Sequence, residues 1–563
     1  MKRLIMGLLS VMALALLLSP SVLTQAQDAP APKTGGEEED KTTESEPADT
    51  NQVAVDFETI GGLMFVKVKV NDKGPYDFLF DSGAQISVIS QRLATELDLE
   101  MSDMPGGGMQ GVGKAEAKAC VVDEFQIGSF KRGKTGAGSL DMDHVSGGLG
   151  RHMMGIIGQN VIKQMKHIEI DFSTGKLTFK LFPEDEMPVD QTEQVIIQTA
   201  EGGAMPGIPG LPGLPGGPGP DKPKKKPGKE DEDEFSFPPI IPNGNFFFQD
   251  EGKTEATKAR REPKDGMTLT YTTGELTIPF LNQTLEITPF WHVDAVINGK
   301  SRRMMFDTGA SALLVLADSF IDELAIPTSF SFTVKGVAEG EARAGLVDSF
   351  ELGSVKDEDV AFMSNALFKV SDQVKEQLGP LGNMLQGLDK LDFDGIVGIS
   401  FCHRFKKTII NNAERTLRFE PYEEAEDNGS SPYEGEDMMK EAVIRTWNGK
   451  AGEFGLSGDG VPLHEWEKNG LETGGLVVEE VTEGSAAAKA GIKVGDILTH
   501  VVDKVEGESP LADGPSLVIY GCMNDPGTEV TVRVKRGEEL LDLKVVLSKY
   551  IWEGTFPERF QRK

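Results

Sequence analysis

The chain has 563 residues, which is enough for three or four domains that each bury a core. Its formal net charge of −33 argues against nucleic acid or an anionic membrane surface as a partner. The three cysteines are far apart and predict no disulfide framework, and the seven histidines are scattered, so we expect no metal site and no cofactor.

The first 26 residues have the pattern of a secretory signal peptide. Lys2 and Arg3 form a basic start, residues 4–18 are apolar, and Thr24-Gln25-Ala26 is a small-residue cleavage site. We therefore expect an exported protein, periplasmic or extracellular, with no integral membrane segment after signal removal. An uncleaved signal anchor is the alternative. Residues 27–51 are polar and acidic, and they predict a disordered lead.

The first folded segment, residues 52–182, is organised around an apolar stretch that ends in an acid. Phe78-Leu79-Phe80 leads directly into Asp81-Ser82-Gly83-Ala84. An aspartate in such surroundings is costly to bury unless partners satisfy its carboxylate. Short β-rich runs alternate with glycine turns on both sides of the stretch, which predicts a small, mainly β domain.

Residues 183–266 have the composition of a linker. Four glycine- and proline-containing triplets between residues 207 and 218 precede a basic block and an acidic block. So few triplets cannot hold a collagen-like triple helix, so we interpret them as a stiff, extended spacer. The charged blocks are expected to be solvated, and a partner-binding tail is the alternative.

Residues 267–422 repeat the first folded segment. Met304-Met305-Phe306 leads into Asp307-Thr308-Gly309-Ala310, and Asp307 follows Asp81 by 226 residues (307 − 81). The run Gly155-Ile156-Ile157-Gly158 is matched by Gly395-Ile396-Val397-Gly398. Landmarks that keep their order across two long units indicate a tandem duplication.

The repeated pattern resembles that of the retropepsin-like aspartic proteases. In each copy an apolar pair precedes Asp-Ser/Thr-Gly-Ala, and an apolar-apolar-Gly run follows later. The resemblance implies two β-barrel units that pair about a pseudo-two-fold axis, with Asp81 and Asp307 as the catalytic residues. It also implies a supporting role for the residues that follow each acid, namely Ser82, Gly83, Ala84, Thr308, Gly309 and Ala310.

Two carboxylates in contact explain why such a pattern supports hydrolysis. They cannot both ionise, so one pKa rises and the pair shares a proton. The ionised member takes a proton from a water held between them, and the protonated member donates to the carbonyl oxygen of the peptide bond. Glycine lets the two backbones approach closely. We expect the Ser82 and Thr308 hydroxyls to bond across the interface and hold the pair rigid.

Two glycine-bearing stretches are candidates for the flaps that this family closes over its substrate. The first is residues 106–113 and the second is residues 335–345. The candidate flap glycines are Gly108, Gly111, Gly113, Gly336 and Gly340.

A second acidic linker, residues 423–447, leads to a third domain at residues 448–550, and residues 551–563 form a tail. The run Gly484-Ser485 to Gly491-Ile492 and Gly495-Asp496-x-Leu498 resembles that of PDZ domains. The resemblance implies a small β-sandwich with short helices that binds a C-terminal or internal peptide along a sheet edge. The candidate binding loop is Phe454-Gly455-Leu456-Ser457, and a packing domain without a ligand is the alternative.

The sequence therefore predicts a mainly β, exported aspartic endopeptidase whose polypeptide substrate meets an Asp81/Asp307 pair. The rival hypothesis is an exported peptide-binding scaffold in which the protease fold has lost catalysis. A third arrangement pairs each unit with its twin in a homodimer. The arrangement within one chain requires the two carboxylates to lie within hydrogen-bond reach of each other.

Overall fold

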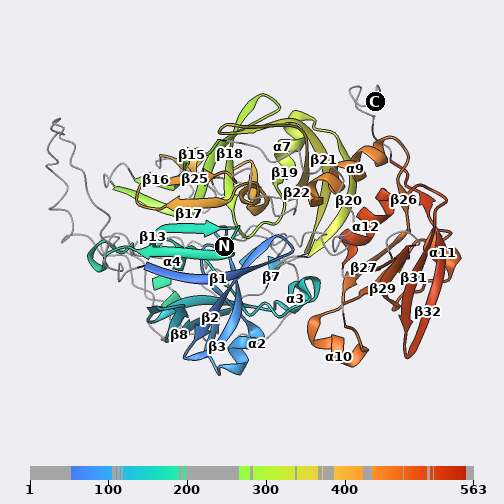
Figure 1. Ribbon diagram of the computed structural model, residues 1–563, viewed down its shortest axis with the longest axis horizontal. Helices are drawn as coiled ribbons and strands as arrows, with labels where there is room; N and C mark the ends of the chain where they lie inside the picture. The colour runs from blue at the N-terminus through green and yellow to red at the C-terminus, as the bar shows by residue number, and fades with distance from the viewer. Residues whose placement is uncertain are drawn as a thin grey trace, which may run out of the picture.

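The fold is mainly β, as predicted, and consists of two similar units followed by a C-terminal module (Figure 1). The predicted signal peptide, the acidic lead and most of the first linker lie outside the described residues. The computed structural model describes residues 52–103, 109–110, 114–115, 118–188, 193–194, 196–197, 265–278, 283–335, 339–365, 371, 386–422, 434–472, 474–503, 507–511, 513–552 and 554.

Unit 1 is a sheet folded around one apolar core. In β2 the side chains of Val66, Val68 and Val70 are buried while Lys67 and Lys69 between them are exposed, as strand alternation requires. Its strands are β1 (Gln52–Ile60), β2 (Leu63–Val70), β3 (Lys73–Phe80), β4 (Val88–Ser90), β5 (Met101–Asp103), β6 (Met109–Gln110), β7 (Lys114–Ala115), β8 (Lys118–Val122), β9 (Phe125–Ile127), β10 (Phe130–Arg132), β11 (Thr135–Leu140), β12 (Gly155–Ile157), β13 (Met165–Asp171) and β14 (Lys176–Leu181). Its helices are α2 (Gln91–Glu96), α3 (Asp143–Leu149), α4 (Gln159–Ile162) and the 3-10 turn η1 (Glu184–Glu186).

Unit 2 repeats this topology. In both units the strand that ends at the aspartate pairs in parallel with the Gly-Ile strand, as β3 with β12 and β18 with β23. Its elements are β15 (Met267–Thr270), β16 (Thr272–Ile278), β17 (Gln283–Ile297), β18 (Lys300–Asp307), β19 (Leu314–Ala317), α7 (Asp318–Leu324), β20 (Thr328–Lys335), β21 (Glu339–Leu352), β22 (Val355–Asn365), η5 (Leu388–Lys390), β23 (Gly395–Gly398), η6 (Ile399–Arg404), β24 (Lys407–Asn411) and β25 (Thr416–Glu420).

The two units are joined by a shared sheet. β13 of unit 1 pairs antiparallel with β24 of unit 2, with Ile168 opposite Ile410. The Asn412 side chain of unit 2 donates to the Met165 carbonyl of unit 1 at 2.7 Å. One apolar cluster contains buried residues from both units. The units therefore pair within one chain, and their relative position is set by backbone hydrogen bonds as well as by apolar packing.

The C-terminal module contains a five-strand path, β27-β28-β29-β31-β32, flanked by short helices. Ser485 caps α11 by accepting from the Ala488 amide at 3.1 Å, and Gly491 ends that helix in a left-handed conformation. The module comprises α9 (Glu434–Trp447), β26 (Gly452–Glu453), β27 (Leu456–Gly460), η8 (Leu463–Glu465), α10 (Trp466–Asn469), β28 (Leu476–Val481), α11 (Ala486–Ala490), β29 (Ile497–Asp503), β30 (Gly507–Pro510), α12 (Gly514–Met523), β31 (Glu529–Arg536), β32 (Glu539–Val546) and β33 (Ser548–Lys549).

Parts of both predicted linkers pack against the folded units. Glu193 and Ile196 lie within residues 183–266, yet both residues are buried in unit 1, where they are 4% and 2% exposed. Within residues 423–447, helix α9 packs on unit 2. Composition marks these segments as polar, but a few buried side chains are enough to fix each of them to a unit.

Candidate active site

The two aspartates lie at equivalent ends of equivalent strands. β3 delivers Asp81, and Asp307 is the last residue of β18. β12, the parallel partner of β3, places Ile157 opposite Phe80. β23, the parallel partner of β18, places Gly398 opposite Asp307. Both acids are almost completely buried, with Asp81 3% and Asp307 1% exposed. The long apolar runs before each acid thus carry both carboxyls into the interior between the units.

The two carboxyl groups meet. The Gly83 amide donates to Asp81 Oδ1 at 2.8 Å and to Asp307 Oδ1 at 3.0 Å, and the two carboxyl groups also hydrogen-bond to each other. The Ala84 amide also donates to Asp81 Oδ1, and the Gly309 amide donates to Asp307 Oδ1. The structure therefore places Asp81 and Asp307 within hydrogen-bond reach, as the arrangement within one chain requires.

Ser82 and Thr308 brace the pair across the interface. The Ser82 hydroxyl donates to the Phe306 carbonyl at 3.1 Å and accepts from the Thr308 amide at 3.0 Å. The Thr308 hydroxyl donates to the Phe80 carbonyl at 2.9 Å and accepts from the Ser82 amide at 3.0 Å. Serine in unit 1 thus makes the same two bonds that threonine makes in unit 2, and the reciprocal set fixes both backbones.

Burial and proximity together raise the pKa of both acids. Burial raises the pKa of Asp307 well above its usual value, and the charge of the neighbouring Asp81 raises it further. Burial raises the pKa of Asp81 to about 6, although hydrogen bonds from Asp307, Gly83 and Ala84 act in the opposite direction. The two groups titrate as a unit, and the raised pKa values mean that the pair holds a proton more tightly than an ordinary aspartate does.

Comparison with known proteins agrees with this geometry. Residues 66–161 and 293–401 match the family model described as aspartyl protease, and residues 460–547 match the model of a PDZ domain. The chain carries two retropepsin-like domains and one PDZ domain. No curated protein matches the sequence.

Several solved structures are similar to parts of this chain at low sequence identity. A retropepsin-like aspartic protease from Rickettsia conorii is 15% identical over 23% of this chain and 90% of its own, with a TM-score of 0.17. A variant of the HtrA-type protease AlgW with a decapeptide is 16% identical over 27% of this chain and 47% of its own, with a TM-score of 0.19. Basic 7S globulin from soybean is 10% identical over 68% of this chain and 98% of its own, with a TM-score of 0.26.

Four of the five candidate flap glycines of the retropepsin-like domains fall outside the described residues. Gly108, Gly111, Gly113 and Gly336 are not described. Gly340 lies in β21, opposite Val334 of β20. β20 and β21 pair antiparallel as a hairpin, and residues 339–345 of the predicted second flap lie in β21.

The candidate peptide loop of the PDZ domain enters an edge strand. Phe454 is buried, Gly455 has a φ of +69°, and Leu456 and Ser457 begin β27. The Gly455 carbonyl accepts from the Thr482 amide at 3.0 Å, and the Phe454 carbonyl accepts from the Ala487 amide at 2.9 Å. The loop is therefore fixed to the rest of the domain through its carbonyls.

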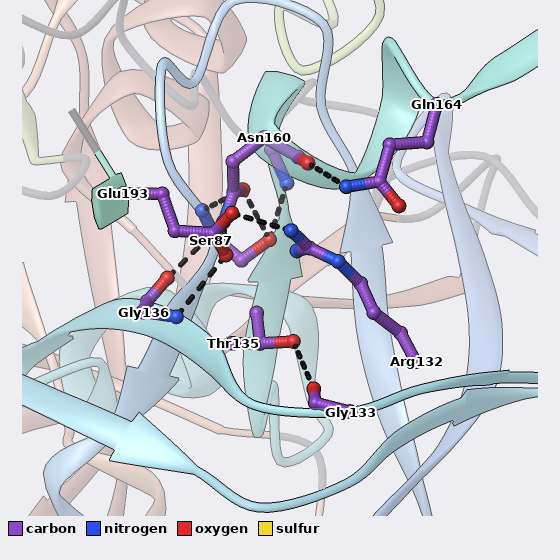
Figure 2. Close-up of polar contacts among 9 residues, drawn as sticks. Ser87, Arg132, Gly133, Thr135, Gly136, Asn160, Gln164 and Glu193 are labelled. Atoms are coloured by element: carbon purple, nitrogen blue, oxygen red, sulfur yellow. Dashed lines mark hydrogen bonds and ion pairs between the residues drawn. The ribbon is translucent and has the colours of Figure 1, made fainter. Parts of the chain in front are cut away.

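Two polar residues behind Asp81 were missed by the sequence analysis. Gln159 donates to the Ser82 carbonyl at 2.8 Å, and the Asn160 side chain accepts from the Ser87 amide at 2.7 Å and from its hydroxyl at 2.9 Å. Figure 2 shows Asn160 at the centre of a buried polar network that also includes Glu193. The sequence signal for this pair is that polar residues directly follow Gly158, whereas unit 2 has the apolar Ile399 directly after Gly398.

Within the described ranges, no cluster of three histidine, cysteine, aspartate or glutamate side chains is placed to hold a metal ion. The three cysteines are free and buried. A search of the described residues found no helix that is long and apolar enough to cross a membrane.

Proposed function

We propose that this chain is an aspartic endopeptidase in which Asp81 and Asp307 activate a water for hydrolysis of a peptide bond. The observation that supports it best is the single Gly83 amide that bonds to one oxygen of each carboxyl. Such contact makes one proton common to both acids, and this is the state that general acid–base hydrolysis by two carboxyls needs. The match to the aspartyl protease model supports a peptidase in the same way.

In the proposed reaction, the ionised carboxylate accepts a proton from the water as its oxygen attacks the carbonyl carbon. The protonated carboxyl donates its proton to the carbonyl oxygen, so the proton count of the pair is unchanged in this step. Backbone amides of Gly83, Ala84 and Gly309 hold the carboxyl oxygens in place throughout. The Ser82–Thr308 brace keeps the two acids in register without touching the substrate.

The PDZ domain is proposed to bind a peptide segment of the substrate or of a partner. An edge strand with its loop, as at Phe454 to Ser457, is the element to which PDZ domains add a peptide strand. We also propose export, on the signal-like pattern of residues 1–26. Detection of a mature chain that begins near residue 27 outside the cytoplasm tests export.

Cleavage of casein, an unstructured protein, by the full mature chain tests the catalytic proposal. The parent is compared with Asp81→Asn and Asp307→Asn from pH 3 to pH 8. Each single substitution is expected to reduce the rate by at least about 100-fold, because each removes one member of the shared-proton pair. A parent that never cuts favours the peptide-binding scaffold instead. Loss on only one substitution excludes a shared pair.

A further inference from the structure

The sheet of unit 2 has one face that carries Asp307. Met305 lies two residues before Asp307 and therefore on the same face. Met305 is opposite Ile396 of β23, Ile396 is opposite Val315 of β19, and Val315 is opposite Met363 of β22. Directly opposed residues share a face, so this row leads from the acid across the sheet to the β20–β21 hairpin. We call it the Asp307 face.

Helix α9 and the PDZ domain pack on the Asp307 face. Val443 and Trp447 of α9 and Ile519 of α12 belong to the same apolar cluster as Met305, Ile396 and Met363. The Trp447 indole donates to the Thr328 carbonyl, at the start of β20, at 3.1 Å. Helix α12, which forms one wall of the PDZ groove, therefore packs with its outer side against the β20–β21 hairpin of unit 2.

The other end of the same domain rests on unit 1. A Cβ at Gly147 of α3 would lie 2.5 Å from the Val461 carbonyl oxygen, so the two backbones touch. Beside this contact, His464 Nδ1 lies 2.6 Å from Asp143 Oδ2. Figure 1 shows the PDZ domain (orange to red) against both units, on the side away from the sheet that the units share. The domain therefore bridges unit 1 and unit 2.

The two walls of the PDZ groove, β27 and α12, touch at one end. A Cβ at Gly514, the first residue of α12, would lie 3.0 Å from the Gly458 carbonyl oxygen of β27. Farther along, a Cβ at Gly521 would lie 3.1 Å from the Gly452 carbonyl oxygen of β26, so this end of α12 packs on the strand that precedes β27. A strand added to β27 needs about 4.8 Å to its neighbour and more for its side chains. Entry of a peptide therefore requires α12 and β27 to separate.

Separation of these two walls cannot leave the units unaffected. α12 is packed with the β20–β21 hairpin of unit 2, and β27 continues into Val461 on α3 of unit 1. The acids themselves are 3% and 1% exposed, so almost none of their surface faces solvent in this conformation. The elements that must separate to open the PDZ groove, α12 and β27, are therefore packed against the two units that carry Asp81 and Asp307.

We propose that the PDZ domain is a gate on access to the Asp81/Asp307 dyad. In the closed state it clamps α3 of unit 1 to the β20–β21 hairpin of unit 2. A polypeptide strand that adds to β27 forces β27 and α12 apart, which withdraws Val461 and His464 from α3 and releases this clamp, so binding in the groove opens the route to the acids. The inference rests on the proposed function for its consequence in catalysis, and the movement itself is testable without any cleavage.

The first arm of the test locks the gate in the full chain. Asp143→Cys with His464→Cys is joined by a short bismaleimide, and each single variant treated in the same way is the control. The native cysteines are buried and so do not compete. We expect the cross-linked double variant to cut casein at least tenfold more slowly than the controls. Equal rates overturn the gate.

The second arm loosens the gate. Asp143→Ala removes the contact with His464, whose side chain is 51% exposed, so the fold should survive. Cleavage is expected to rise about 2- to 5-fold, as the loss of one surface contact allows. Hydrogen exchange of β20–β21 is expected to become faster together with that of α3. If the parent and this variant both fail to cut, the proposed function fails, and unchanged exchange in β20–β21 then overturns the gate as well.

Discussion

Gly309 of unit 2 lies directly against Asp81 of unit 1. A Cβ at position 309 would sit 2.3 Å from the Asp81 carboxyl carbon and 2.4 Å from its Oδ1. No real Cβ makes so short a contact, so the acid of one unit occupies the space that any larger residue in the other unit would need. The glycine of the second Asp-Thr-Gly run is thus required by the first acid.

Gly309→Ala is expected to separate the dyad. The added methyl must push Asp81 away or shift the backbone, at a cost of about 1–3 kcal/mol. Cleavage of casein should fall at least about 100-fold, as for loss of one acid. Gly133→Ala is the control, because a Cβ there meets no atom within 4 Å. Retained cleavage in Gly309→Ala would mean that the two acids do not act in contact.

We expect casein cleavage to be lost at acidic pH, and not to be confined to acidic pH. Burial raises the pKa of Asp81 to about 6, and the pKa of Asp307 lies above its ordinary value for the same reason. Below pH 6 both carboxyls become protonated and none can accept the proton of water. The pH profile of kcat/KM for casein should therefore decline below about pH 6. An optimum near pH 3 would contradict this prediction.

The sequence predicts the fold well where a pattern repeats. The apolar runs before Asp81 and Asp307, with their Gly-Ile partners, are local signals that fix strand type and burial. The Ser82–Thr308 brace was also expected, since a hydroxyl follows each acid. The arrangement of the PDZ domain across both units had no such signal. It depends on contacts such as those of the Trp447 side chain and the Val461 backbone carbonyl, and the sequence around both residues looks like that of any packed helix or strand.

His292 of unit 2 stands where unit 1 has Phe65. His292 lies opposite Met305, and Phe65 lies opposite Leu79, which precedes Asp81 by the same two residues. His292 is 2% exposed, and in the described part of the chain neither ring nitrogen has a hydrogen-bond partner. Burial lowers the pKa of its imidazole to about 4. A buried polar group without partners is destabilising.

His292→Phe is therefore expected to raise the free energy of unfolding by about 1 kcal/mol at pH 7. The gain should grow as pH falls from 6.5 toward 4, because there the unfolded chain of the parent binds a proton that the folded imidazole does not. Urea unfolding at pH 7 and pH 5 measures both effects. Phe65→His is the reciprocal variant and should destabilise. A loss of stability in His292→Phe would show that the imidazole has a bound partner, such as water.

Glu193 anchors the start of the predicted first linker to unit 1. Its carboxylate forms an ion pair with Arg132 and accepts from the Gly136 amide and the Asn160 side chain, both at 3.1 Å (Figure 2). The Glu193 side chain is 6% exposed and that of Arg132 is 13% exposed. Removal of one partner from a buried ion pair leaves the other charge uncompensated, which costs about 3–5 kcal/mol.

Glu193→Ala should therefore lower the midpoint of urea unfolding of the full chain, with the loss confined to unit 1. Hydrogen exchange should become faster in β11 and around Asn160, because both lose a bond to this carboxylate. Glu186→Ala is the matched control, since its contact with Lys166 at 3.4 Å lies on the surface and contributes little. Because Asn160 also holds Ser87, six residues after Asp81, a fall in casein cleavage is expected along with the loss of stability. Equal stability of the two variants would mean that residues near 193 do not belong to unit 1.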